Sequence, residues 1–252
     1  MKLSGYTLTR NCITLDYCYR ECIQSLLKVC DEVVVSDSDS TDGTLEALEQ
    51  MAAQDARIRI IRWPWENPFD NKEWFVRWIN GTRVHLNHPM QLELDADEVL
   101  DDTPECLNAV RCAVEAGACR FFDRMNFWQD HRHIVPEGYV CGRFVARLGK
   151  SNLYMPSDEP YPARSPNVRE QAATHDALKI FHYGFIRKRD AFLEKSEIVQ
   201  TAFHGSCDER LKRCKREGLD IVAECPFPQP LWEYAGEHPV VAQAWLRERG
   251  YA

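Results

Sequence analysis

The sequence predicts an α/β fold with a mainly parallel central sheet flanked by helices, and two observations support this prediction. Between about residues 3 and 102, apolar runs of strand length alternate with segments in which apolar residues recur at helical spacing. The run at residues 33–35 is continuously apolar, which is typical of a parallel strand buried on both faces. The resulting order β-α-β-α-β-α-β predicts right-handed crossovers that place helices against the sheet.

The individual elements are predicted without any internal repeat. Strands are expected at residues 3–9, 32–36, 57–62, 91–94, 119–129, 138–148 and 178–184. Helices are expected at residues 15–26, 45–52, 74–87, 104–114, 189–203, 210–216 and 240–249. Residues 149–177 contain four prolines and are expected to form a long irregular loop, which in a compact domain is usually functional or mobile. A largely helical C-terminal extension is expected after about residue 200.

The composition is that of an ordinary soluble globular protein. The net charge of −8 over 252 residues argues against broad electrostatic binding to a polyanion. The eleven cysteines are scattered without Cys-x-x-Cys pairs and are expected to be reduced, core-filling thiols of a cytoplasmic protein. The N-terminus lacks the apolar core of a signal peptide, and no apolar run reaches membrane-spanning length. Any membrane association is therefore expected to be peripheral.

A polar turn beginning with Asp37 follows the strand predicted at residues 32–36. Open α/β sheets bind ligands beyond the carboxyl ends of their strands, which is where this turn lies. Asp37 is a candidate hydrogen-bond acceptor for a ribose or a base, and the alternative is that it only caps the following helix. Three further turn residues are expected to act mainly as caps: Ser40, Thr41 and Asp42. The first strand ends in a similar polar loop, Thr9-Arg10-Asn11.

Two aspartates, Asp95 and Asp97, follow the fourth predicted strand. If the chain continues extended, residues two apart project to the same side, so both carboxylates would face one point beyond the strand end. Carboxylates held together repel unless a cation lies between them. Hard cations such as Mg²⁺ or Mn²⁺ prefer oxygen ligands and often share them with substrate phosphates. The alternative is an ordinary turn or helix start, where aspartate is common.

Taken together, the two motifs resemble those of the family-2 glycosyltransferases. Residues 33–44 are similar to that family's nucleotide-binding turn, an apolar strand followed by Asp and then Ser-Thr-Asp-Gly-Thr. Residues 94–98, Leu-Asp-Ala-Asp-Glu, are similar to its metal motif and lie about sixty residues further on, which leaves room for two βα units. The resemblance covers about residues 3–102, weakens to about residue 200 and fades beyond. Asp-Ala-Asp-Glu and the later His-Tyr-Gly are most similar to the branch that includes lipopolysaccharide-core glucosyltransferases.

The resemblance implies the Rossmann-like GT-A fold and a metal-dependent, inverting transfer of a sugar from a nucleotide-diphosphate sugar to an acceptor hydroxyl. Mn²⁺ or Mg²⁺ would neutralise the charge that develops on the leaving diphosphate. Asp97 would ligate the metal, and Asp95 would lie near the metal or the ribose. His182 matches a histidine that binds metal or diphosphate in the family, although a lone histidine is more often structural. The implied donor-binding residues are Thr9, Asn11, Asp37, Asp95, Arg143 and Arg147, the two arginines as phosphate contacts or as ordinary surface ion pairs.

Inversion by direct displacement needs a general base within hydrogen-bond reach of the acceptor hydroxyl. In the family this carboxylate lies between the metal motif and the C-terminal histidine, and here Asp158 and Glu159 in the Pro-rich loop are the best match. Their order is the reverse of the usual Glu-Asp pair, and no Gln-x-x-Arg-Trp motif follows, which argues against a processive synthase. The alternative is a solvated pair, in which case Glu170 or Asp176 is the next candidate.

The resemblance also suggests how the chain is divided. Residues 1–200 are expected to form the glycosyltransferase domain, with a nucleotide-sugar-binding half at 1–102 and an acceptor half at 103–200. Residues 201–252 are expected to pack on the same domain.

Several acceptors and two other classes of function stay open at this point. The acceptor is expected to be a saccharide, a small molecule or a hydroxylated nucleic-acid base, and only the basic cluster at residues 210–216 favours nucleic acid. A catalytically silent nucleotide-sugar-binding module on the same fold is the first alternative class. A nucleotidyltransferase is the second, but no Gly-rich phosphate loop opens the chain.

Overall fold

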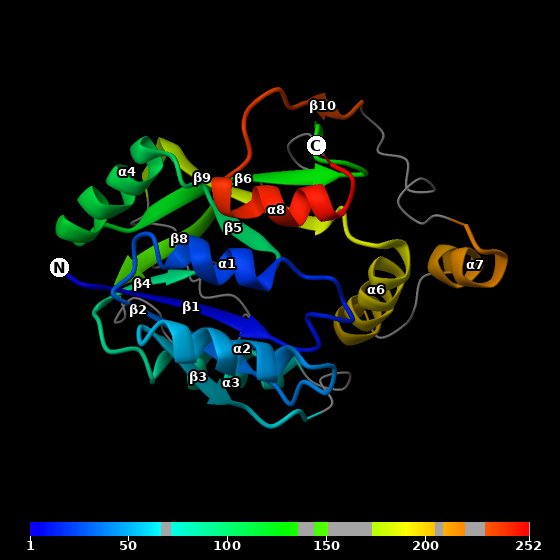
Figure 1. The fold of residues 1–252 in the computed structure, drawn as a ribbon, viewed down its shortest axis with the longest axis horizontal. Helices are drawn as coiled ribbons and strands as arrows, with labels where there is room; N and C mark the ends of the chain where they lie inside the picture. The colour runs from blue at the N-terminus through cyan, green and yellow to red at the C-terminus, as the bar shows by residue number, and fades with distance from the viewer. Residues whose placement is uncertain (67–71, 136–143, 151–172, 205–208, 220–229, 252) are drawn as a thin grey trace.

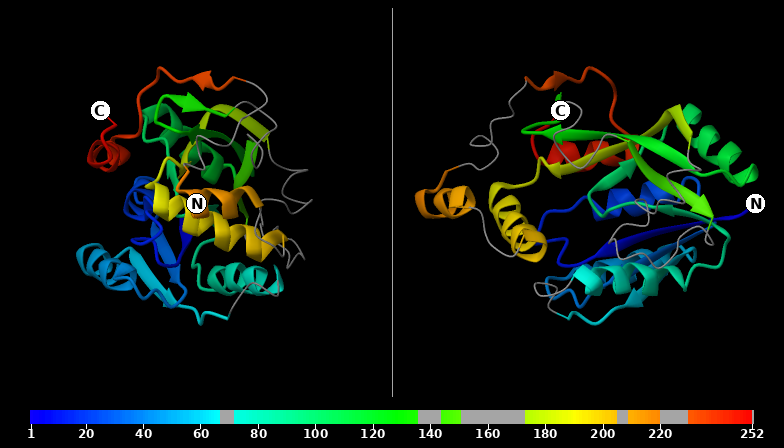
Figure 2. Two further views of the ribbon diagram at one scale, coloured as in Figure 1. Left: turned by 90° about the vertical axis from the view of Figure 1, so that its right-hand side faces the viewer. Right: turned by 180° about the vertical axis from the view of Figure 1, so that it is seen from behind.

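A ten-stranded sheet runs through the fold, and helices lie on both sides of it (Figures 1 and 2). The computed structural model describes residues 1–66, 72–135, 144–150, 173–204, 209–219 and 230–251. Within these residues the main path of the sheet has the strand order β10-β7-β6-β8-β4-β1-β2-β3, and β9 pairs with both β5 and β6. The predicted α/β class with a central, mostly parallel sheet is confirmed.

The N-terminal strands form the parallel part of the sheet. They are β1 (Leu3–Thr9), β2 (Glu32–Asp37), β3 (Ile58–Arg62) and β4 (Met90–Glu93), with β1 between β2 and β4. Their crossovers contain α1 (Tyr19–Leu26), α2 (Thr44–Gln54) and α3 (Lys72–Arg83). Figure 2 shows α2 and α3 on opposite faces of the sheet. Because both faces are covered, the side chains of Val33, Val34 and Val35 are all fully buried.

The rest of the sheet is of mixed direction. Its strands are β5 (Glu98–Leu100), β6 (Arg120–Trp128), β7 (His133–Ile134), β8 (Phe144–Lys150), β9 (Ala173–Phe185) and β10 (Trp232–Glu233). Strand β8 lies antiparallel between β4 and β6 and so joins the two parts, while β9 runs parallel to β6 and antiparallel to β5. The helices of this part are α4 (Pro104–Glu115), α6 (Arg189–His204), α7 (Glu209–Glu217) and α8 (Val240–Glu248).

Helix α8 brings the C-terminal residues back onto the sheet. Its Ala242, Trp245 and Leu246 are buried in a cluster with Cys18 of the α1 N-terminus and the aromatic side chains of β6 and β9. The neighbouring backbone is also anchored, since the amides of Val240 and Val241 donate to the Asp102 carboxylate. Helix α8, the start of α1 and strands β6 and β9 therefore share one apolar cluster.

The structure differs from the predicted elements mainly at two places. Strand β4 ends at Glu93, so Leu94 and Asp95 do not continue it, and the next residues turn. Strand β9 begins at Ala173, earlier than residue 178, because its exposed first residues lack the apolar pattern on which the prediction relied. Strands β5, β7 and β10 were not predicted, since two or three residues are too few to show a period of two.

The cysteines and the membrane prediction can be compared with the structure directly. The eight cysteines among the described residues are all free, and only Cys112 is exposed. The remaining seven fill buried positions, as predicted. In the part of the chain that the structure describes, no helix is long and apolar enough to cross a membrane.

Candidate active site

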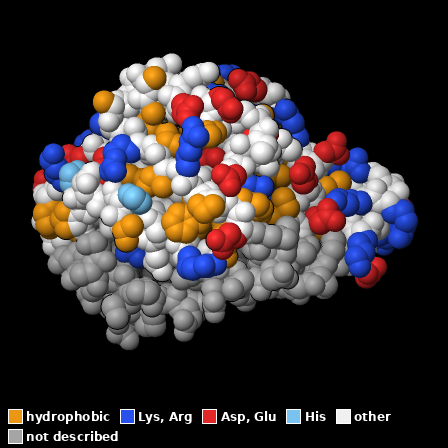
Figure 3. All heavy atoms as spheres, turned by 90° about the horizontal axis from the view of Figure 1, so that it is seen from below, with side chains coloured by type: hydrophobic (Ala, Val, Ile, Leu, Met, Phe, Trp, Pro, Cys, Tyr) orange, Lys and Arg blue, Asp and Glu red, His pale blue; other side chains and the backbone are white. Residues whose placement is uncertain are grey.

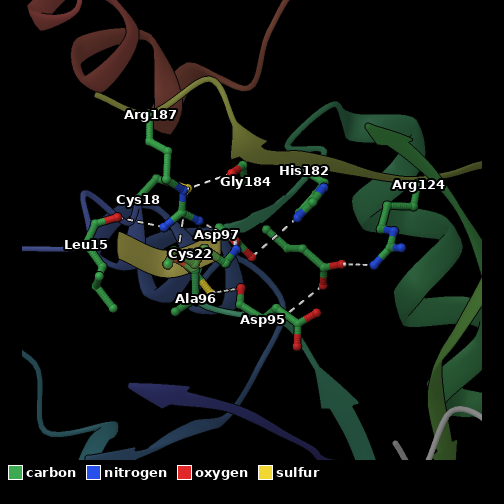
Figure 4. A network of polar contacts seen from close by, with 12 residues as sticks. Leu15, Cys18, Cys22, Asp95, Ala96, Asp97, Arg124, His182, Gly184 and Arg187 are labelled. Carbon is green, nitrogen blue, oxygen red and sulfur yellow. Dashed lines mark hydrogen bonds and ion pairs between the residues drawn. The ribbon is translucent and has the colours of Figure 1, made fainter. Parts of the chain in front are cut away.

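The two aspartates of the Asp-Ala-Asp-Glu motif lie in a tight turn between β4 and β5. The amide of Glu98 donates to the carbonyl of Asp95 at 2.8 Å, and the amide of Asp95 donates to the Glu98 carboxylate at 3.0 Å. Glu98 is itself buried and paired with Arg124 at 3.1 Å. The expectation of an extended chain, with both carboxylates facing one point, is therefore wrong. Asp97 is buried, whereas Asp95 is half-buried and extends away from the Asp97 carboxylate (Figure 4).

Two thiols, Cys22 in helix α1 and Cys18 just before it, contact the backbone of this turn. The Cys22 thiol donates to the carbonyl of Asp95 at 3.4 Å, and the Cys18 thiol lies 3.9 Å from the carbonyl of Ala96 (Figure 4). Both thiols are completely buried, and burial raises the pKa of each well above its usual value. They act as neutral, space-filling donors that hold the backbone of the turn.

The Asp97 carboxylate is the centre of a charged cluster built from the C-terminal half. Its Oδ2 accepts hydrogen bonds from Arg187 Nη2 at 2.5 Å and from Lys195 Nζ at 2.6 Å. Its Oδ1 lies 3.6 Å from His182 Nε2, and its backbone carbonyl accepts from the Tyr183 amide at 2.9 Å. The sequence-based search found Asp97 and His182 but missed Arg187 and Lys195, because nothing in their local sequence marks them.

Arg187 is fixed in place by several contacts at once. Its Nε donates to the carbonyl of Gly184 at 2.8 Å, and its Nη1 donates to the carbonyl of Leu15 at 2.6 Å (Figure 4). Its guanidinium also lies 4.0 Å from the centre of the Tyr17 ring, and its side chain has no exposed surface. Arg187 therefore ties the loop after β1 to the end of β9 and to Asp97.

The cluster sets the charge of its members. Burial by itself raises the pKa of Asp97, but Lys195, His182 and Arg187 outweigh it and hold that pKa well below the usual value. Burial lowers the pKa of His182, and Asp97 only partly opposes this shift. The site thus pairs the Asp97 carboxylate with Arg187 and Lys195, while burial disfavours the charged form of the His182 imidazole. Nδ1 of His182 is buried and has no hydrogen-bond partner among the described residues.

The predicted metal ligands fit a divalent ion in part. Asp97 and His182 lie side by side, and the backbone of Gly184 packs closely against both, since a Cβ there would be only 2.5 Å from His182 Nε2 and 2.8 Å from Asp97 Oδ2. Carboxylate and imidazole are suitable ligands for Mn²⁺. Asp95, the third predicted ligand, does not join them, and the described residues include no group of three or more acidic, His or Cys side chains placed to hold a metal. A divalent ion could reach Asp97 Oδ2 only if Lys195 moved away.

The second part of the site is the Asp37 turn at the carboxyl ends of β1 and β2. Asp37 Oδ1 accepts from the Ser40 amide at 3.0 Å, and its Oδ2 accepts from Thr9 Oγ1 at 3.0 Å and from Ser40 Oγ at 2.6 Å. Asn11 Oδ1 accepts from the Thr41 amide at 2.8 Å. The structure thus brings together three predicted donor-binding residues: Thr9, Asn11 and Asp37. The N-cap of α2 is Gly43 rather than Asp42, whose carboxylate instead accepts from the Thr44 amide two residues on.

Arg10 lies at the rim of this turn and was not among the predicted residues. Its Nη1 donates to the carbonyls of Ser38 and Asp39 at 2.5 and 3.0 Å. Its guanidinium stacks 3.7 Å from the centre of the Trp65 ring, and the Trp65 amide donates to Asp39. Its position between Thr9 and Asn11, two predicted donor-binding residues, is the sequence feature that could have indicated Arg10 as a site residue. It places a fixed positive charge beside the Asp37 turn.

Most of the other predicted site residues cannot be placed relative to these two turns. Asp158, Glu159, Glu170 and Arg143 lie outside the described residues, and Arg147 is in β8 with a side chain that the structure does not describe. Asp176 is exposed on β9. The choice of general base among these carboxylates therefore stays a prediction.

The fold and the site define an α/β protein with polar side chains gathered at the carboxyl edge of parallel strands. Residues 18–118 match the sequence profile of Glycosyl transferase family 2. This stretch includes both the Asp37 turn and the Asp95–Glu98 turn. Enzymes of this family commonly use divalent metals. A search of the curated proteins finds no match to the sequence.

Solved structures with a similar fold include crystal structures of S. aureus TarS. The TarS 1–349 structure in complex with UDP-GlcNAc is 15% identical, with a TM-score of 0.51, over 80% of this chain and 66% of that one. A longer TarS structure is 15% identical, with a TM-score of 0.50, over 79% of this chain and 39% of that one. At this identity the similarity shows a shared fold. The chain spans less than two thirds of either TarS structure.

Proposed function

We propose that the protein transfers a sugar, with inversion, from a nucleotide-diphosphate sugar to an acceptor hydroxyl. The observation that carries this proposal is the family match over residues 18–118, because it contains both polar turns at the sheet edge. Helix α6 lies beyond the carboxyl ends of β1 and β2, next to these turns (Figure 1). A donor bound along this edge would have its nucleoside near the Asp37 turn and its diphosphate near the Asp97 cluster.

The charges of the site suit such a donor. Two cations, Arg187 and Lys195, face the single carboxylate of Asp97, and Arg10 adds a third cation beside the Asp37 turn. Of these, Arg187 and Arg10 are held in place, and preorganised positive charge stabilises a leaving diphosphate without reorganisation during the reaction. When bound by Asp97 and His182, Mn²⁺ or Mg²⁺ would add Lewis-acid stabilisation of the same leaving group. Asp95 is proposed to approach the ribose or the metal from its half-buried position.

The general base is proposed to be Asp158 or Glu159, with Asp176 and Glu170 as reserves. Support comes from the two buried carboxylates of the site, because both oxygens of Asp37 accept hydrogen bonds and Asp97 is held as a weakly basic carboxylate by two cations on its Oδ2. Neither is free to take a proton from an acceptor hydroxyl. A third carboxylate must therefore do so if the displacement is direct.

For the acceptor we propose a saccharide, in line with the resemblance to the lipopolysaccharide-core branch. The basic helix α7 gives little support to a nucleic-acid acceptor. Lys215 is paired with Glu197, and Arg216 with Glu217. Charged side chains of both signs are interspersed over the described part of the face shown in Figure 3, including the end where α7 lies. We also propose that residues 201–252 belong to the same domain, because α8 shares its core, and that the protein is cytoplasmic, as its free thiols suggest.

The test is a screen of nucleotide sugars followed by a transfer assay. UDP-sugars come first, because TarS was crystallised with UDP-GlcNAc. A donor at 100 times its Kd should raise the free energy of unfolding by about 2.7 kcal/mol. Donors that stabilise the protein with Mn²⁺ are then incubated with saccharide acceptors, and the product is identified by mass spectrometry. Stabilisation without any transfer would favour the silent binding module, and no stabilisation by any nucleotide sugar would overturn the proposal.

A further inference from the structure

We infer that Lys195 is an exchangeable counter-ion. In the donor-free protein it neutralises Asp97, and on donor binding it leaves Asp97 and pairs with the donor diphosphate. This inference rests on the proposed function, since it assumes a diphosphate donor. It adds a donor-binding residue on α6, outside the stretch that matches the family.

The Asp97 cluster holds more positive charge than the carboxylate needs. Asp97 Oδ2 alone accepts hydrogen bonds from both Arg187 and Lys195. One of these cations would be enough to balance a single buried carboxylate. The second is therefore available for another anion, and a diphosphate is the anion that the proposed reaction would bring.

The two cations differ in how firmly they are held. Arg187 donates to two backbone carbonyls besides Asp97, lies on the Tyr17 ring and has a side chain that is 0% exposed. The Lys195 side chain is 20% exposed, and its ammonium lies between Asp97 and the Tyr17 ring, 5.0 Å from the ring centre. A lysine on a flexible four-carbon stem can change partners at small cost, whereas the fixed guanidinium cannot. Lys195 is thus the cation that can move.

The departure of Lys195 would also open Asp97 to a metal ion. Lys195 Nζ lies 2.6 Å from Oδ2 of this carboxylate, whose Oδ1 is 3.6 Å from His182 Nε2. A divalent ion arriving with the diphosphate would be repelled by the ammonium, while the diphosphate would attract it. When Lys195 moves from the Asp97 carboxylate to the diphosphate, its ammonium no longer repels the metal ion from Asp97. The same movement gives the diphosphate a positively charged partner.

The experiment compares Lys195→Met with the parent protein in two binding measurements. The first is Mn²⁺ alone, followed by electron paramagnetic resonance of the free ion. Loss of the competing ammonium should tighten Mn²⁺ binding by about tenfold. The second is UDP in the presence of Mn²⁺, measured by calorimetry, with GDP as the alternative probe. Loss of the diphosphate contact should weaken this binding by roughly 10- to 100-fold.

The opposite signs of the two effects separate the inference from a merely structural role, which would weaken both. Lys195→Arg should keep much of the UDP affinity, because it retains the charge. Lys215→Met removes an equal charge from exposed α7 and should change neither measurement. Equal Mn²⁺ affinity, or equal UDP affinity, in folded Lys195→Met and parent proteins would overturn the exchange. If the parent protein binds neither UDP nor GDP nor any nucleotide sugar, the proposed function is contradicted. The proposed exchange of Lys195, which depends on that function, is then contradicted as well.

Discussion

Asp37 and Asp97 are both almost fully buried carboxylates near the carboxyl edge of the sheet, at 1% and 3% exposure, but they are held in different ways. Asp37 accepts hydrogen bonds from neutral donors, the Thr9 and Ser40 hydroxyls and a backbone amide. Asp97 accepts from two cations. The neutral donors around Asp37 fix the shape of a turn. The two cations on Asp97 leave one positive charge that can pair with another anion. The residue type is the same, so the neighbours decide the role.

The largest effect is expected from removing the general base. Because Asp37 and Asp97 are held by hydrogen-bond donors, a third carboxylate is expected to take the proton from the acceptor hydroxyl. Glu159→Gln should leave donor and metal binding intact and lower transfer by roughly 10²–10⁴-fold, the usual loss when a general base is removed. The measurement is single-turnover transfer with saturating donor. Asp158→Asn is the matched control, since only one of two neighbouring side chains should face the acceptor. If both variants react within a few-fold of the parent, the base is another carboxylate, and Glu170 or Asp176 is tested next.

Asp97→Asn should show how much activity and stability are lost when the negative charge that pairs with Arg187 and Lys195 is removed. Transfer should fall by about 10²–10³-fold, because the leaving diphosphate loses organised electrostatic stabilisation. The free energy of unfolding should fall by about 3 kcal/mol, since Arg187 stays buried without its counter-charge. Urea unfolding and single-turnover kinetics measure the two effects. Near-normal turnover in the folded variant would contradict a role for Asp97 in the reaction.

Asp37 variants should show the smaller cost of losing neutral hydrogen bonds. Asp37→Asn should lower the free energy of unfolding by about 1–2 kcal/mol, because its donors carry no charge. Asp37→Ala should also weaken nucleoside diphosphate binding by about 1–3 kcal/mol if this turn contacts the nucleoside. Calorimetry measures the affinity. Unchanged affinity in Asp37→Ala would limit Asp37 to holding the turn, and an unfolding cost as large as that of Asp97→Asn would remove the contrast between the two carboxylates.

The smallest expected effect is on stability in mild acid, and it comes from His238, which is not part of either carboxylate site. His238 Nε2 donates to the carbonyl of His131, so its Nδ1 accepts from the Tyr183 hydroxyl at 2.8 Å. Burial lowers the pKa of His238 from 6.5 to about 4. The unfolded chain therefore binds a proton that the folded protein does not, and stability should fall as the pH drops from about 6.5 towards 4.

His238→Gln removes this titration and is the test of its size. The urea midpoint of the parent should drop more between pH 7.5 and pH 5 than that of the variant. An equal drop in both proteins would assign the acid sensitivity to other groups. The result also shows whether the contacts of the C-terminal segment, rather than the Asp97 cluster, limit stability in mild acid.

The sequence by itself determined the parts of the site that depend on neighbours along the chain. The continuous Val33-Val34-Val35 run requires a strand buried on both faces, and the polar residues after it must turn before α2 begins. The positions of Asp37 and Asp97 at the ends of predicted strands followed from the same periodicity. Local hydrogen bonds and burial are sufficient for these features, which is why they were predictable.

Only the tertiary structure decided what surrounds Asp97. Arg187 and Lys195 reach its carboxylate from 90 and 98 residues away, and the buried Asp16 pairs with Arg249, 233 residues further on. No periodicity encodes which distant cation will neutralise a given carboxylate, because that depends on how β9, α6 and α8 pack after the sheet has formed. The turn that separates Asp95 from Asp97 is set in the same way, by the buried Glu98–Arg124 pair and the two thiols beneath it.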